Sequence, residues 1–120
     1  MSVLFLEYPK CSTCKKARKW LDEHGVAYVA RDIVTDNPTA AELAKFHQRS
    51  GLPVRRLFNS SGMKYRELGL KAKLDAGISD EECYELLATD GMLVKRPLLI
   101  GDDFAIPGFK EGAWAKALLG

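Results

Sequence analysis

Two cysteines separated by two residues, Cys11 and Cys14, have the type and spacing of a thiol–disulfide pair. They lie between an apolar run at 3–6 and a segment with helical spacing at 15–24. The unpartnered N–H groups and the positive end of a helix stabilise an anion, so they favour a thiolate on Cys11. Because the thiolate is the attacking species, we expect Cys11 to be the nucleophile and Cys14 to resolve the mixed disulfide.

Basic residues are dense around this pair. Lys10 and Lys15 flank the cysteines directly, and we take both as candidate substrate-binding residues. The same segment continues with Lys16, Arg18 and Lys19. Such a cluster is usually a solvated helix face, but beside thiols it also favours an anionic substrate or an acidic partner.

Metal binding is the main alternative for the cysteine pair, because Cys-x-x-Cys also forms half of many zinc sites. The chain offers Cys83, His24 and His47 as further ligands, and none lies near another at ligand spacing. We therefore expect no metal. The remaining alternative, two cysteines that act as small apolar side chains at a helix start, fits the strand–turn–helix context less well.

Size and composition indicate one ordinary globular domain over 1–120. The chain is 47% hydrophobic and 28% charged, and no apolar run is long enough to span a bilayer. The first residues lack the basic and apolar regions of a signal peptide, so we expect a cytoplasmic protein with reduced thiols. A net charge of +2 gives no reason to expect direct nucleic-acid binding.

The predicted elements describe an α/β fold. A strand at 3–7, a helix that Ser12 or Thr13 caps, and a strand at 26–29 that continues to 33 form a parallel, right-handed βαβ unit. Helices are expected at 40–50, 53–58, 64–68, 71–76 and 79–88, then strands at 98–100 and 104–106 around a hairpin, and a helix at 111–119. This order predicts a thioredoxin-like βαβ–ββα frame, a small mixed sheet flanked by helices, with a helical insertion at about 39–90.

Arg96 and Pro97 precede the third strand, where a proline is tolerated because it donates nothing to a sheet ladder. Thioredoxin-like folds carry a cis proline at this place, facing the redox pair, so we expect a cis bond here. We expect the backbone of this segment and the planar donor fork of Arg96 to position an incoming sulfur or oxyanion. The alternative is a trans proline that starts a strand, with Arg96 in a surface ion pair.

Other conspicuous residues have plain structural interpretations. We expect Cys83 to be buried and inert, with a third redox cysteine as the alternative. Trp20 and Trp114 have apolar neighbours at helical spacing and are expected in the core. Tyr65 is expected to pack inside the insertion or to line the cleft.

Three motifs in order resemble the ArsC/Spx family: YPKCSTCKKA at 8–17, YRELGL at 65–70 and KRPL at 95–98. This family contains glutaredoxin-coupled arsenate reductases and Spx-type regulators of RNA polymerase. The resemblance covers 3–114. It implies a thioredoxin-like fold, with Cys11 as the catalytic cysteine and Arg96 as the arginine before the cis proline.

The resemblance also has departures. The reductases of the family bind the oxyanion with two further arginines, which fall near Asn59 and near Lys110 in this sequence, where no arginine stands. Arg56 or Lys110 are the available substitutes, although lysine is not a bidentate donor. Those reductases generally lack a second cysteine at the position of Cys14, which favours dithiol chemistry here.

The resulting hypothesis is a thiol–disulfide oxidoreductase that uses Cys11 and Cys14, without a metal or organic cofactor. Its electrons come from glutathione, glutaredoxin or thioredoxin. Two alternatives remain: an arsenate reductase whose substrate is an oxyanion, and an Spx-like redox-sensing regulator that binds the RNA polymerase α subunit.

Overall fold

A computed structural model describes residues 3–120 of the protein. The strands are β1 (Val3–Glu7), β2 (Tyr28–Asp32), β3 (Leu98–Ile100) and β4 (Ala105–Pro107). The α-helices are α1 (Ser12–Glu23), α2 (Ala40–Ser50), α3 (Met63–Glu67), α4 (Leu70–Asp75), α5 (Asp80–Thr89) and α6 (Glu111–Leu119), and two short 3₁₀ helices are η1 (Val54–Leu57) and η2 (Gly91–Leu93).

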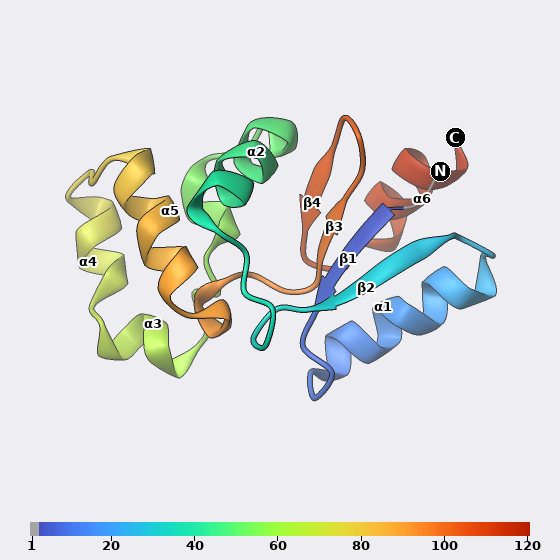
Figure 1. The fold of residues 1–120 in the computed structure, drawn as a ribbon, viewed down its shortest axis with the longest axis horizontal. Helices are drawn as coiled ribbons and strands as arrows, with labels where there is room; N and C mark the ends of the chain where they lie inside the picture. Colours follow the sequence, from blue (N-terminus) through green and yellow to red (C-terminus); the bar gives the residue numbers. More distant parts are fainter. Residues whose placement is uncertain (1–2) are drawn as a thin grey trace.

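The four strands form one mixed sheet in the order β2-β1-β3-β4. β1 and β2 pair in parallel, whereas β3 is antiparallel to both β1 and β4. This is the α/β, thioredoxin-like sheet that the element order predicts. We call the sheet with α1 and α6 the frame, and the helices from α2 to η2 the insertion. Figure 1 shows α3, α4 and α5 on one side of the sheet, at the end of the molecule away from both termini.

Alternation along β1 divides the core into two clusters, because successive side chains of a strand point to opposite faces. Phe5 packs with the helices of the frame, where its ring centroid lies 6.2 Å from that of Trp114, and Trp20 lies 6.0 Å from Trp114. Both tryptophans are buried, as the sequence predicts. Leu6 belongs to the other cluster, which joins the sheet to the insertion.

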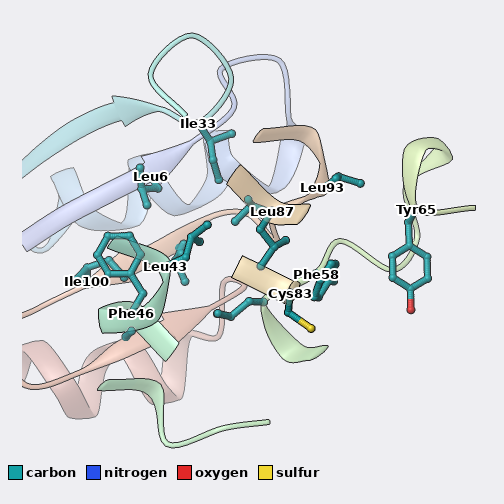
Figure 2. Close-up of a cluster of buried hydrophobic side chains, with 14 of the residues drawn as sticks. Leu6, Ile33, Leu43, Phe46, Phe58, Tyr65, Cys83, Leu87, Leu93 and Ile100 are labelled. Atoms are coloured by element: carbon teal, nitrogen blue, oxygen red, sulfur yellow. The ribbon is translucent and has the colours of Figure 1, made fainter. Parts of the chain in front are cut away.

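Figure 2 shows this second cluster, which runs from Leu6 and Ile33 to Phe58 and Tyr65. Cys83 on α5 lies inside it and is fully buried. Burial raises the pKa of the Cys83 thiol, with a further contribution from the acidic side chains of Asp80 and Glu82. A buried thiol that resists ionisation is a poor nucleophile, so the inert interpretation fits this environment.

The start of α1 differs from the sequence prediction. The N-cap residue is Cys11, with extended backbone angles and no side-chain cap bond, rather than Ser12 or Thr13. Both of those residues are already helical, since serine and threonine preferences near a helix start are local and do not fix the first residue. The shift matters because it places the Cys11 side chain itself at the positive end of α1.

Other differences are small and lie at element ends. The second strand begins at Tyr28 rather than at 26, and the helix expected at 53–58 is the 3₁₀ helix η1. The 3₁₀ helix η2 was not predicted, because a single turn is too short to show a helical spacing of apolar residues. The Asp90 carboxylate holds this turn by accepting from the Met92 N–H at 2.9 Å. The capping box of Thr39 and Glu42 at α2 is confirmed.

Within residues 3–120, no helix combines the length and apolar character needed to cross a membrane.

Candidate active site

Cys11 and Cys14 occupy the turn that leads from β1 into α1. The Cys11 N–H donates to the Tyr8 carbonyl at 2.9 Å, and the Cys11 carbonyl accepts the Lys15 N–H at 3.1 Å. Cys11 is half-buried and Cys14 is fully buried. Both are free thiols, as is Cys83. The site therefore exposes one sulfur to a substrate and keeps the second beneath it.

The pKa values of the two thiols are shifted in opposite directions. For Cys11, burial disfavours the thiolate, but hydrogen bonds from the Cys14 N–H and thiol, the Thr13 N–H and the charge of Arg96 outweigh it, so the pKa is lowered. The Thr13 and Cys14 N–H groups belong to the first turn of α1, where backbone donors have no partner within the helix. The pKa of Cys14 is raised to about 12, first by burial and then by the adjacent Cys11, although the Tyr8 N–H opposes this shift. That N–H lies 3.5 Å from the Cys14 sulfur.

Arg96 faces this turn from the start of β3. The bond between Arg96 and Pro97 is cis, as the sequence analysis expects. The guanidinium carbon lies 5.4 Å from the Tyr8 ring centroid, and Nη1 donates to the Met92 carbonyl at 3.2 Å. A cation over an aromatic face is a favourable contact, which helps to hold the side chain in place.

One donor of Arg96 has no acceptor in the described part of the chain. Its Nε is buried without a hydrogen-bond partner, and the side chain has no ion pair among residues 3–120. The alternative of a surface ion pair is therefore not what the structure contains. A buried donor without a partner costs free energy.

The other candidate substrate-binding residues, Pro97, Lys10 and Lys15, have fewer groups available to a ligand in the two cavities. Pro97 is buried, and its carbonyl accepts the Gly108 N–H at 2.8 Å, so this backbone oxygen is already engaged. Lys10 and Lys15 are exposed and line neither of the cavities described below. Their contribution to substrate binding stays a prediction based on charge at a distance.

One cavity of about 470 Å³ opens above Cys11, and we call it the thiol cavity. The frame contributes Cys11 and Thr13, and Lys95 and Arg96 come from the segment before β3. The insertion supplies the opposite wall: Asn59, Ser61, Gly62, Met63, Lys64 and Met92.

A second cavity of about 370 Å³ shares Thr13, Lys95 and Arg96 with the first, and we call it the basic cavity. Its other walls are Arg56 from η1 and the segment after β4: Pro107, Gly108, Phe109 and Lys110. Among residues 3–120, no aspartate or glutamate lines either cavity. The thiol of Cys11 therefore lies in cationic surroundings, which suit an anionic or acidic ligand.

The sequence analysis did not identify Met63 and Met92 as cavity residues. It considered Asn59 only as a position where related reductases have an arginine, whereas the structure places Asn59 in the wall of the thiol cavity. Met63 and Met92 carry no motif, and only the packing of α3 and η2 near the cysteine turn brings them to the cavity. The histidines lie elsewhere: His24 stacks on Trp20, and His47 contacts the Tyr84 hydroxyl at 2.6 Å and the Leu52 carbonyl at 2.9 Å. In the part of the chain that is described, no group of three or more His, Cys, Asp or Glu side chains converges.

Known proteins are similar to this chain over nearly its whole length. YusI of Bacillus subtilis is 50% identical over 111 residues, which cover 92% of this chain and 93% of YusI. The crystal structure of an ArsC family related protein from Bacteroides fragilis has 52% identity and a TM-score of 0.91, covering 97% of this chain and 98% of that one. An arsenate reductase from Vibrio cholerae has 27% identity and a TM-score of 0.81, with 99% and 96% covered.

The family model that matches the sequence spans residues 6–117, from β1 through both cysteines and Arg96 into α6. Its extent and these relatives agree with the motifs at 8–17, 65–70 and 95–98. The chain belongs to the ArsC family.

Proposed function

We propose that this protein is a thiol–disulfide oxidoreductase in which Cys11 attacks a substrate disulfide and Cys14 completes the exchange. The observation that carries the proposal is the opposite shift of the two thiol pKa values, lowered at Cys11 and raised to about 12 at Cys14. A half-buried thiolate beside a fully buried thiol is the arrangement that a two-step exchange needs.

In the first step, the Cys11 thiolate attacks one sulfur of the substrate disulfide. The substrate S–S bond breaks, a bond from Cys11 to that sulfur forms, and the other sulfur leaves as a thiolate that takes up a proton. Arg96 stabilises the anions of this step, because its charge acts on the Cys11 sulfur and the residue lines the cavity above it.

In the second step, Cys14 loses its proton and its sulfur attacks Cys11, which releases the second substrate thiol. The charge on Cys11 is one cause of the raised pKa of Cys14, and the mixed disulfide removes that charge. The resolving thiol therefore ionises more readily once it is needed. Two electrons have then passed to the substrate, and Cys11 and Cys14 share a disulfide.

A thiol donor restores the reduced pair and is itself oxidised to a disulfide. Glutathione, glutaredoxin and thioredoxin are the donors we propose, in the reducing environment of the cytoplasm. No metal or organic cofactor takes part in these steps.

The test uses the reduced protein and 2-hydroxyethyl disulfide, a small uncharged substrate, with intact mass read after thiol trapping. We expect the native protein to end as an internal disulfide, lighter by two hydrogens. Cys14→Ser should stop at the adduct on Cys11, and Cys11→Ser should not react. An adduct that persists in the native protein would contradict a resolving role for Cys14.

Arsenate reduction is the second candidate, favoured by the likeness to the Vibrio cholerae enzyme and by the cationic walls around Cys11. In that route Cys11 attacks arsenic, Arg96 binds the oxyanion, and glutathione supplies the electrons. Asn59 weakens this candidate, because a neutral amide stands in the cavity wall where the resemblance leads us to look for an arginine. Turnover of arsenate with glutathione that survives Cys14→Ser would favour it over the dithiol route.

The third alternative, a regulator that binds the RNA polymerase α subunit, stays a prediction. A pull-down of the α subunit that depends on the redox state of Cys11 and Cys14 tests it.

A further inference from the structure

The two cavities beside Cys11 differ in chemical character. Thr13, Lys95 and Arg96 form the wall between them. On one side the thiol cavity carries Met63 and Met92, and on the other the basic cavity carries Arg56 and Lys110. A ligand that reacts at Cys11 therefore meets an apolar rim in one direction and a cationic pocket in the other.

The cations of the basic cavity lack carboxylate partners within the described part of the chain. Arg56, Lys95 and Lys110 form no ion pair there. Two nearby cations do have partners: Arg55 pairs with Asp75 at 3.0 Å and Lys64 with Asp90 at 3.8 Å. The basic cavity thus brings together three cations without such partners, which favours a ligand carboxylate.

The apolar rim of the thiol cavity is open to solvent. Met63 is 74% exposed although it stands beside the reactive thiol, and Met92 lies half-buried within the same cavity. Methionine side chains are flexible and polarizable, so they adapt to apolar groups of different shape. An exposed methionine at this place is suited to a side chain of a binding partner.

The two cavities together offer more room than a compact ligand fills. Each cavity, at about 470 and 370 Å³, falls in the range of sites that hold organic molecules of many atoms. A small thiol with a carboxylate fills one side and leaves the methionine rim unused. A polypeptide that passes over Cys11 reaches both sides.

We infer that the natural substrate is an extended, cysteine-containing segment of a partner protein, with an acidic residue in the basic cavity and an apolar residue on the methionine rim. This inference rests on the proposed function, since it names the disulfide that Cys11 attacks. The partner cysteine forms the mixed disulfide described above, and the same thiol donor regenerates the enzyme.

The experiment measures second-order rate constants for the reduced full-length protein with short peptides. Each peptide carries one cysteine in a mixed disulfide with 2-mercaptoethanol, flanked by Asp or Lys on one side and by Leu or Ser on the other, in both orders. The Asp/Leu peptide in its preferred order should react about tenfold faster than the Lys/Ser peptide at low salt, with a smaller ratio at high salt.

Paired variants assign the preference to each cavity. Lys110→Glu should remove or reverse the preference for Asp, whereas Lys116→Glu on the exposed part of α6 makes the same charge change outside both cavities and should preserve it. Met63→Ser should reduce the preference for Leu, and Leu68→Ser, at a 43% exposed apolar side chain outside the thiol cavity, should not.

Reaction of the native protein with 2-hydroxyethyl disulfide distinguishes a failure of this inference from a failure of the proposed function. If that reagent and all peptides react within about twofold of one another, the inference is wrong and the oxidoreductase proposal stands. If neither the reagent nor any peptide reacts, both are wrong. If oxidised glutathione reacts faster than every peptide, the substrate is a small anionic disulfide and the inference is overturned. It is also overturned if Lys110→Glu behaves like Lys116→Glu.

Discussion

The frame and the insertion contribute differently to the site around Cys11. The frame supplies the reactive sulfur and the free N–H groups of α1 that lower its pKa. The insertion supplies Met63 and Lys64 as cavity wall, and η2 offers the Met92 carbonyl that holds Arg96. Our proposal assigns the reactivity of the thiol mainly to the frame, and the choice of substrate to side chains on the short helices of the insertion. Substitutions in the insertion should therefore change substrate choice more than chemistry.

The largest difference between frame and insertion is expected when a cysteine of each is replaced. Cys11→Ser should reduce disulfide reduction by about 10³-fold or more, because it removes the nucleophile. Cys83→Ala, in the buried core of the insertion, should keep the rate constant with 2-hydroxyethyl disulfide close to that of the native protein. A large loss in Cys83→Ala, with an unchanged circular dichroism spectrum, would show that the insertion takes part in the redox chemistry.

The contact between insertion and frame is tested at Gly91. A Cβ added there would lie 1.8 Å from the Ile33 carbonyl oxygen, which follows β2. Gly91→Ala should lower the free energy of unfolding by about 2–4 kcal/mol, because backbone must move to admit the methyl group. Gly112→Ala in α6, where a Cβ meets nothing within 4 Å, should raise it by up to about 1 kcal/mol. Urea denaturation measures both, and equal midpoints would contradict the close packing at η2.

Arg96 links the two regions, since Tyr8 of the frame and Met92 of the insertion both contact it. Arg96→Gln should raise the pKa of Cys11, because it removes a charge that lowers it. The pH profile of iodoacetamide alkylation should therefore move to higher pH, with less thiolate at neutral pH. Tyr8→Leu should move the profile in the same direction by less, and Arg55→Gln, outside the cavity, should leave it in place. An unmoved profile in Arg96→Gln would mean that the helix start alone activates Cys11.

The smallest effect is expected at the start of α2. The Arg31 guanidinium, assisted by the Thr39 N–H, lowers the pKa of Glu42 to about 2 from its ordinary 4.5. A lowered folded-state pKa gives stability that is present above the unfolded-state pKa and lost as the pH falls towards 2. Glu42→Gln should cost about 1 kcal/mol at neutral pH, and the difference from the native protein should shrink over this acidic range. Thermal unfolding from pH 7 to pH 2 measures it, with the exposed and unpaired Glu85→Gln as control.

The sequence predicts the helices and strands well because their signals are local. The apolar run before Cys11, the capping box at Thr39 and the glycine stops each depend on neighbours along the chain, and the order of elements then fixes the sheet. The single-domain boundaries, the roles of the site residues and the absence of a cofactor stay predictions.

The cavity walls depend on contacts between distant segments, so the sequence did not indicate them. Tyr8 and Arg96 meet across most of the chain, and Met63 reaches the thiol only through the packing of the insertion. Conversely, Lys10 and Lys15 are adjacent to the cysteines in sequence but project outside both cavities. Their contribution to substrate binding stays a prediction.

A redox titration of the purified protein in glutathione buffers tests the central claim most directly, with intact mass read after thiol trapping and Cys11→Ser and Cys14→Ser as controls. The account predicts a reversible loss of two hydrogens that requires both cysteines, with a potential that identifies the donors able to reduce the pair. If instead Cys11 only accumulates a glutathione adduct, with Cys14 never oxidised, the dithiol mechanism is wrong.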